Sequence, residues 1–599
     1  VPMRAPGAPR RAIFPYRPDC PPAGNPMQTA GPLPRAALAL CLLTVFALTL
    51  RWWALDYLLP HHPEPDAQLV LQAQEFRSGE RELEFVRSTY PHLLSRLIAL
   101  LPVESCELPL EPAHEDAHLK AAASPYLQGR RVCATISALA IPLTYLIARR
   151  WLSSAAALLA AALLATSLLH LNYSQQARPH APFATLVLLC LWTALRARER
   201  PSQPRFAALG LATCLAAGSL HSAICLLPVL PLSLWLSEGG ARRRPALLLW
   251  PLLGGLASVP LFWPFLFDPA PAGPWTEGES HRFPHRLERA WFDASGFAKQ
   301  ARFLWDHDPL LLALGGLGLC LFALDRWRRR PDFRWRPLAL MLGFALPYGL
   351  LIGLLGKTFP RFFIPLLPLL AILCASVPER LWTLFDPRRR RLLALSSAAA
   401  LLLFPAFVAG RLVYLRSLPD TWERAADDIG PLLREASSTI VTSPTVAPPR
   451  ILRVDPAFGA HLRRTPQHQP WLWYLERQRL AGKSLIGPLL HVWQVEGRFI
   501  ADQILTDPSG QDFAASLRGT GLQAALFGAI DHPVALDSMR QGLELLGGST
   551  YWVPEAGPIP RVAYHRDYQD EDLLFRVLSR GLWGPAVLVH RAALQTAAR

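Results

Sequence analysis

Residues 388–414 read RRRRLLALSSAAALLLFPAFVAGRLVY. Four arginines stand directly before an apolar run, 392–414, in which Arg411 is the only charged residue. An α-helix rises about 1.5 Å per residue, so roughly 20 apolar residues cross the hydrocarbon core of a bilayer. Basic residues beside such a run favour the cytoplasmic side of the membrane. The stretch therefore predicts a transmembrane helix that starts in the cytoplasm and ends outside it.

Apolar runs of this kind recur through the first two-thirds of the chain. Hydrophobic residues make up 51% of the sequence and the mean hydropathy is +0.20, which is high for a soluble protein of this length. The runs lie at 36–55, 131–148, 153–171, 181–195, 206–221, 222–236, 246–266, 309–324, 337–355, 362–378 and 392–414. We therefore expect an all-α polytopic membrane domain over 34–415, with about 11 transmembrane helices.

The net charge of +16 raises the question of nucleic-acid binding. The arginines gather in short segments between the expected spans, at Arg149–Arg150, Arg196–Arg205, Arg242–Arg244, Arg326–Arg336 and Arg380–Arg391. Threading the chain through a membrane brings all five segments to one side, together with the Pro-rich basic tail 1–33, which we expect to be disordered and cytoplasmic. This distribution predicts a membrane orientation and argues against a nucleic-acid partner. The preference for arginine over lysine suggests a GC-rich bacterial genome, and hence the inner membrane.

The same threading places the first outer loop, 56–128, and the whole of 416–599 on the periplasmic side. Residues 416–599 contain no long apolar run and predict a soluble α/β domain. Helices are expected at 421–436, 511–521 and 534–546, and strands at Thr439–Thr442, His491–Val495, Ala524–Phe527, Val562–Tyr564 and Ala586–Val589. We find no hydrolase, dinucleotide or nucleotide-phosphate motif there. The nine cysteines show no CxxC spacing, so neither a disulfide framework nor a zinc knuckle is expected.

Three polar motifs fall where expected spans meet the outer surface, a position in which ionisable groups are usually functional. The first is His61-His62-Pro63-Glu64-Pro65-Asp66-Ala67, which precedes an amphipathic segment, Gln68–Gly79, and then Tyr90-Pro91-His92. The second is Tyr173-Ser174-Gln175-Gln176-Ala177-Arg178-Pro179-His180, at the end of the third span. The third is Lys357-Thr358-Phe359-Pro360-Arg361-Phe362-Phe363-Ile364-Pro365.

The order and placement of these motifs resemble the GT-C glycosyltransferases, and more narrowly the protein O-mannosyltransferase and aminoarabinose-transferase superfamily, like glycosyltransferase family 39. That family has an acidic motif in the first outer loop and an Ala-Arg-Pro-Asp-Ala sequence after the third span. This chain matches at Ala177, Arg178 and Pro179. It departs at His180, where the family usually has Asp, and at Ala67, where a second acid is common. The resemblance implies a GT-C-like fold over roughly 36–415 and sugar transfer from a polyprenyl-phosphate carrier.

The chemistry of such a donor is simple, because polyprenyl phosphate is already a good leaving group. One carboxylate must accept the proton of the acceptor hydroxyl, and fixed cations must stabilise the departing phosphate. Asp66 is the expected base and Glu64 the runner-up. The expected substrate-binding residues are Arg178, Lys357, Arg361, His180, Tyr90 and His92. A single displacement without a second carboxylate predicts inversion at the sugar carbon.

Other interpretations of these residues stay open. Asp66 could cap the helix that begins near Gln68, and Arg178 could be an ordinary interfacial arginine. No cofactor is firmly expected, although His61, His62 and Glu64 could ligate a divalent metal ion. A lipid or polysaccharide transporter, or an inactive homologue that acts as a scaffold, are the alternative functions. The expected partners are membrane lipids, a polyprenyl-phosphate sugar and a hydroxyl acceptor that is a protein, a lipid or a glycan.

Overall fold

The computed structural model describes residues 33–59, 68–78, 90–108, 114–237, 244–263, 292–327, 335–356, 358–383, 385, 387–421, 423–425, 427–428, 439–442, 453–454, 489–490, 509, 511–518, 522–528, 540–553, 572–579, 581–584 and 587–592. The acidic motif with Glu64 and Asp66, and also Lys357, lie outside these ranges.

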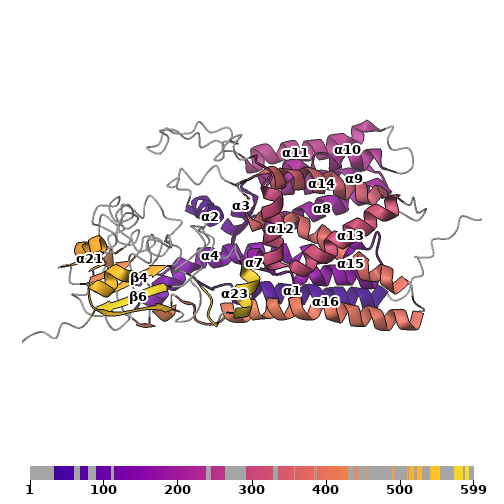
Figure 1. The fold of residues 1–599 in the computed structure, drawn as a ribbon. Helices are drawn as coiled ribbons and strands as arrows, with labels where there is room; N and C mark the ends of the chain where they lie inside the picture. Colours follow the sequence, from indigo (N-terminus) through magenta and orange to yellow (C-terminus); the bar gives the residue numbers. More distant parts are fainter. Residues whose placement is uncertain are drawn as a thin grey trace, which may run out of the picture.

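The fold is mostly helical, and each of the eleven expected spans falls on a helical segment (Figure 1). The segments are α1 (Leu33–Trp52), α4 (Glu115–Ala138), α5 (Ala140–Ala148), α6 (Ser154–Ala165), α7 (Leu168–Ser174), α8 (His180–Glu199), α9 (Gln203–Ala217), η3 (His221–Leu226), α10 (Val229–Trp235), η5 (Pro245–Leu248), α11 (Leu249–Phe262), α13 (Pro309–Trp327), α14 (Trp335–Leu354), η8 (Pro360–Leu366), α15 (Leu367–Thr383) and α16 (Pro387–Arg416). Within the described residues, seven helical segments are long and apolar enough to cross a membrane. There are eight if α6 and α7 form one span.

Two of the expected spans differ from a plain straight helix. The apolar run 153–171 is broken between α6 and α7, whose axes differ by 54°. The second span begins earlier than expected, because α4 starts at Glu115 inside the segment that was expected to be outer loop. Its polar first turns carry helix-forming residues that need no lipid contact, so apolar composition alone could not mark where this helix begins.

The basic ends of several spans meet at one end of the bundle. Arg150 forms an ion pair with Glu199 at 2.8 Å, which joins the ends of α5 and α8. The backbone amide of Ser153 donates to Glu379 at 2.6 Å, and Arg380 donates to the carbonyl of Leu321 at 3.2 Å. The helices α5, α8, α13 and α15 therefore carry their arginines at the same end.

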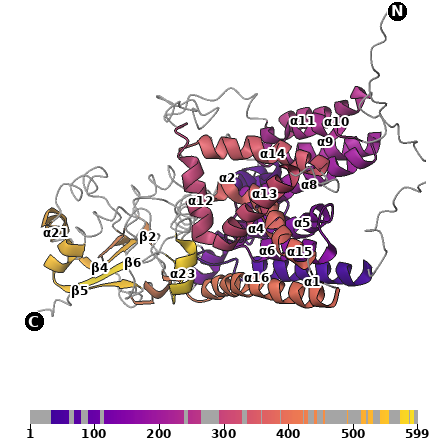
Figure 2. The same ribbon diagram turned by 45° about the vertical axis from the view of Figure 1, so that its right-hand side comes forward.

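The other end of the bundle carries short helices and the C-terminal region (Figures 1 and 2). Here α2 (Gln68–Ser78) packs on α3 (Leu93–Ala99), and Arg77 donates to the carbonyls of Ile98 and Leu101 at 2.6 and 2.9 Å. The amphipathic helix α12 (Gly296–His307) runs across the direction of the long helices (Figure 1). The described residues of the second and third polar motifs lie beside these elements.

The C-terminal region contains a six-stranded sheet of order β2-β3-β1-β4-β6-β5. The strands are β1 (Thr439–Thr442), β2 (Arg453–Val454), β3 (Leu489–Leu490), β4 (Leu522–Gly528), β5 (Gly548–Val553) and β6 (Val587–Ala592), with helices α21 (Gln511–Leu517) and α23 (Leu573–Ser579). The first four strands in that order pair in parallel, and β6 runs antiparallel to β4 and β5.

Three of the expected strands coincide with β1, β4 and β6, while β2, β3 and β5 were not expected. The expected strands 491–495 and 562–564 lie outside the described residues. Helix α23 packs against α16, where Arg411 donates to the carbonyl of Val577 at 2.6 Å.

Candidate functional site

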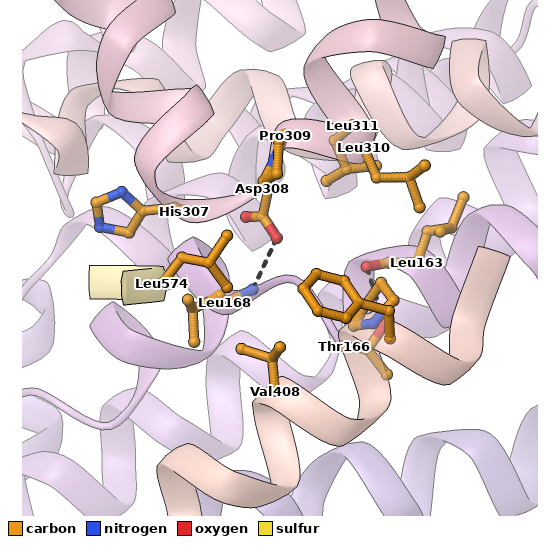
Figure 3. A pocket seen from close by; sticks show the side chains of 12 residues that line it. Leu163, Thr166, Leu168, His307, Asp308, Pro309, Leu310, Leu311, Val408 and Leu574 are labelled. Carbon is orange, nitrogen blue, oxygen red and sulfur yellow. Dashed lines mark hydrogen bonds between the residues drawn. The ribbon is translucent and has the colours of Figure 1, made fainter. Parts of the chain in front are cut away.

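The short helix α7 is held at its N-terminus by a buried acid from a distant part of the chain. The carboxylate of Asp308, between α12 and α13, accepts the backbone amide of Leu168 at 2.9 Å (Figure 3). It also accepts the hydroxyl of Ser167 at 2.7 Å and the backbone amide of Leu169 at 3.1 Å. The first amides of a helix have no partner within the helix and attract negative charge. Asp308 therefore fixes where α7 begins after the break from α6.

The remainder of α7 carries buried polar groups that bind two arginines. Arg51, in the last turn of α1, donates to Nδ1 of His170 at 2.9 Å and to the carbonyl of Ala47, also at 2.9 Å. Arg416, at the end of α16, donates to the side-chain oxygen of Asn172 at 2.5 Å and to that of Gln175. The polar face of α7 thus joins the first span to the last.

Arg178 lies in the turn between α7 and α8 and is only 1% exposed. Its guanidinium carbon is 6.0 Å from the centre of the Tyr173 ring, and its backbone amide donates to the carbonyl of Gln176 at 2.8 Å. Ala177, just before it, packs with Val70 of α2 around Gly129 of α4, where a Cβ would lie within 3.0 Å of both side chains. The start of α2 and the Arg178 turn are therefore neighbours.

Aromatic contacts connect the second and third motifs. The imidazole of His180 stacks on Phe362 at 5.6 Å and meets the ring of Tyr90 edge-on at 6.5 Å. Arg361 lies over the rings of Phe359 and Phe362, at 4.1 and 5.5 Å. Residues from three separated segments, predicted independently from sequence, thus meet at the N-terminus of α8.

Two further contacts involve the helices α2, α3 and α12 near this cluster. His92 packs edge-on against Phe76 at 5.1 Å, in the contact between α2 and α3. Gln300 of α12 donates to the hydroxyl of Thr358 and to the carbonyl of Phe359 at 3.2 Å. Helix α12 therefore holds the segment that leads into Arg361.

The structure describes four of the site residues expected from sequence in one neighbourhood: Arg178, His180, Tyr90 and Arg361. The expected base Asp66, its runner-up Glu64, Lys357 and the histidines His61 and His62 lie outside the described residues. Among the residues that are described, no group of three or more His, Cys, Asp or Glu could hold a metal ion.

Three buried residues of the site were not singled out from sequence: Asp308, Arg51 and Arg416. Each carries a sequence signal that could have found it. Arg51 and Arg416 are charged residues in the last turns of apolar spans, and Asp308 stands directly before the apolar run that begins at Pro309. An ionisable residue at such a position is costly unless it is paired or functional.

A comparison with protein-family models matches residues 123–267 to dolichyl-phosphate-mannose-protein mannosyltransferase. The matched segment contains the Ala177-Arg178-Pro179 motif and runs from α4 to the end of α11. The predicted resemblance to the GT-C glycosyltransferases is confirmed. The comparison with curated proteins gave no match.

Solved structures give three matches of interest. The oligosaccharyltransferase of Archaeoglobus fulgidus, in complex with zinc and sulfate, is 12% identical, with a TM-score of 0.49 over 86% of this chain and 71% of that chain. ArnT from Cupriavidus metallidurans, in the apo state, is 15% identical, with a TM-score of 0.43 over 92% and 98%. The S. cerevisiae protein O-mannosyltransferase Pmt1–Pmt2 complex, bound to its sugar donor, is 16% identical, with a TM-score of 0.27 over 38% and 32%.

Proposed function

We propose that this protein is a membrane glycosyltransferase that moves a sugar from a polyprenyl-phosphate carrier to an acceptor hydroxyl on the outer face of the membrane. The observation that carries the proposal is the burial of Arg178 beside the cluster of Tyr90, His180 and Arg361. The matched family is named for its sugar donor, dolichyl-phosphate mannose, and dolichyl phosphate is a polyprenyl-type phosphate carrier.

The cations of the site suit a phosphate leaving group. A guanidinium presents a planar fork that binds two phosphate oxygens, and a buried one acts with little screening by water. Arg178 is mounted on Tyr173 and Arg361 on Phe359 and Phe362, so both are held in place before any donor arrives. Preorganised charge of this kind lowers the energy of a transition state in which negative charge grows on the carrier phosphate.

The base is proposed to be Asp66, with Glu64 as the runner-up. Asp66 stands two positions before α2, whose residue Val70 packs beside Ala177, the neighbour of Arg178. A carboxylate at that point of the chain would accept the acceptor's proton while Arg178 and Arg361 hold the phosphate. With a single carboxylate in this role, the reaction inverts the sugar carbon. Lys357, His92, Tyr90 and His180 complete the proposed substrate contacts.

A transporter is the one alternative that a specific observation favours, namely the break between α6 and α7. Broken spans in transporters present free helix ends to a substrate. Here the N-terminus of α7 is already occupied by the carboxylate of Asp308, which accepts three hydrogen bonds from it. The break therefore gives less support to transport than an open helix end would.

The proposal is tested with purified protein in lipid nanodiscs and a panel of polyprenyl-phosphate sugars. Arg178→Ala should reduce the rate of sugar transfer by the equivalent of roughly 2–4 kcal/mol of transition-state stabilisation. Arg178→Lys should recover part of that loss, because it restores the charge without the planar fork. Arg96, an exposed arginine of α3, provides the matched control, and Arg96→Ala should transfer sugar at the wild-type rate. Wild-type turnover in a folded Arg178→Ala variant would remove this arginine from the site.

A further inference from the structure

Arg416 connects four parts of the molecule from one buried position. It ends α16 and is 3% exposed. Its two terminal nitrogens donate to the side-chain oxygens of Asn172 and Gln175 on and after α7. Its guanidinium carbon also lies 4.0 Å from the centre of the Tyr57 ring and 4.8 Å from that of Trp583. A guanidinium shared between two amide oxygens and two aromatic faces has little freedom to move.

The hydrogen bonds of Arg416 to α7 lie close in sequence to Arg178. Asn172 and Gln175 flank Tyr173, the ring on which Arg178 rests. The amide nitrogen of Gln175 also donates to the carbonyls of Leu50 and Trp53, at 3.1 and 2.9 Å. The last turn of α7 is thus tied to Arg416 and to the end of α1, and the turn that carries Arg178 leaves from it.

On the side of α1, the contact reaches the segment that leads into the acidic motif. Tyr57 lies between Arg416 and Arg130, whose guanidinium is 4.4 Å from the centre of the ring. Arg130 also donates to the carbonyls of Leu55 and Tyr57, at 2.6 and 2.8 Å. Leu58 has a φ of 60° in this segment, a conformation that a non-glycine residue holds only with support from its surroundings.

The third connection is to the C-terminal region. Trp583 contributes its ring to Arg416, and its carbonyl accepts the backbone amide of Thr421 at 3.0 Å. A movement of the segment around Trp583 would therefore displace Arg416, and through Arg416 also Tyr57 and α7.

We propose that Arg416 is a positioning residue that makes the placement of the donor-phosphate arginine Arg178 depend on the docking of the C-terminal region. The inference rests on the proposed function, in which Arg178 binds the carrier phosphate. Arg416 itself is not a catalytic residue, because its partners are protein groups. The docked position of the C-terminal region then sets the affinity of the protein for the donor.

The test is a double-mutant cycle, with undecaprenyl phosphate as the probe and full-length protein in nanodiscs. Arg416→Gln removes the shared guanidinium, and we expect the Kd for undecaprenyl phosphate to rise about tenfold. In an Arg178→Ala background the same substitution should change the Kd by less than about twofold, because the arginine that Arg416 positions is already absent. A merely structural role would weaken binding equally in both backgrounds, and that result would overturn the proposal.

Two further variants make the test specific. Trp583→Ala should raise the Kd in the same non-additive way, and Trp583→Phe should restore most of the affinity because it keeps an aromatic face for Arg416. Arg380→Gln is the matched control, since Arg380 donates to the carbonyl of Leu321 at the opposite end of the bundle, away from the C-terminal region. It should leave the Kd for undecaprenyl phosphate near the wild-type value, whereas a rise equal to that of Arg416→Gln would contradict a specific role.

Different results overturn the proposed function and the positioning role of Arg416. A folded wild-type protein that binds no undecaprenyl phosphate would overturn the proposed function, and the inference with it. A wild-type protein that binds the lipid, together with an Arg416→Gln variant that binds it equally well, would overturn the inference alone. Thermal unfolding of each variant in the same nanodiscs identifies any that has failed to fold, and Arg416→Lys then repeats the cycle with the charge retained.

Discussion

The carboxylate of Asp308 accepts the backbone amide of Leu168 at 2.9 Å, although the two residues lie 140 positions apart. The same carboxylate binds Leu169 and Ser167, so one acid supplies the start of α7 with three bonds. A short helix has little stability of its own and depends on such contacts. The position of α7, and of the arginine that follows it, is therefore set by a loop from the other half of the membrane region.

Asp308→Ala should destabilise the protein by about 1–2 kcal/mol, the usual cost of losing a helix cap. Asp308→Asn keeps one acceptor oxygen and should cost less. Thermal unfolding in detergent measures both. Ser153 caps α6 with a bond of 3.4 Å to the amide of Ala156, and Ser153→Ala is expected to have a smaller effect. An unfolding temperature unchanged by Asp308→Ala would show that α7 is held elsewhere.

The protein should lose stability as the pH falls from about 6.5 to about 4, partly through His307. Burial and, to a smaller extent, the charge of Arg576 lower the pKa of His307 to about 4, although a hydrogen bond to the carbonyl of Phe303 acts against the shift. In this window the unfolded chain binds a proton that the folded protein does not, so stability decreases as the pH decreases. The loss amounts to at most about 3 kcal/mol.

His307→Gln should flatten this part of the pH profile when unfolding is measured at several pH values between 4 and 7. Asp308 acts in the opposite direction, because burial raises the pKa of its carboxyl and the folded state then binds a proton more readily than the unfolded chain. A profile with the same slope in the variant and the wild type would assign the acid sensitivity to other groups.

Gly254→Ala should be strongly destabilising, because α9 and α11 touch there through their backbones. A Cβ at Gly254 would lie 2.1 Å from the carbonyl oxygen of Gly210. Small residues allow such close approach of helices in a membrane, and overpacking costs about 1–3 kcal/mol. Gly255 is the matched control, since a Cβ there would meet only Thr213, at 3.9 Å. Equal unfolding temperatures for Gly254→Ala and Gly255→Ala would contradict this packing.

The membrane spans could be predicted from sequence because lipid imposes one rule on every span: about 20 apolar residues in a helix. The break between α6 and α7 could not, since 153–171 reads as one apolar run and the cause of the break is Asp308, far along the chain. The direction of α12 across the bundle could not be predicted either. An amphipathic pattern indicates which face of a helix is buried, but it does not identify the elements that cover that face.

The candidate site could be predicted only for those residues that stand out from the sequence immediately around them. Arg178 and His180 interrupt apolar sequence at the end of a span, and they stand in a motif that resembles one of the glycosyltransferase family; both features made them candidates. The role of Arg416 depends on partners that lie more than 240 positions earlier in the chain, Asn172 and Gln175, and on Tyr57. The composition of the chain and the spacing of its residues do not indicate that Arg416 contacts these distant residues.

A reporter that is active only outside the cytoplasm, fused after residue 430, should be active. The reason is the positive-inside rule together with the gathering of Arg150, Glu199 and Arg380 at one end of the bundle, away from the sheet. A fusion within 238–243 should be inactive with the same reporter and serves as the control. Activity in the reverse pattern would invert the orientation and place the proposed site in the cytoplasm.

Asp66→Asn should abolish most of the sugar transfer while leaving the protein folded and able to bind its donor. Asparagine is nearly the same size as aspartate and is an equally good helix cap, so a residue that only caps α2 would tolerate the change. A general base would not, because the amide cannot accept the proton of the acceptor hydroxyl, and the rate should fall by about 10²–10⁴-fold.

Glu64→Gln is the matched variant on the same motif and should retain most of the wild-type rate. The measurement is single-turnover transfer from a polyprenyl-phosphate sugar at saturating donor, with binding of undecaprenyl phosphate measured separately. If Asp66→Asn is active and Glu64→Gln is not, the base is Glu64 and the alignment of the acidic motif shifts by two residues. Full activity in both variants would mean that neither carboxylate acts as the base, and the proposed transfer mechanism would fail with them.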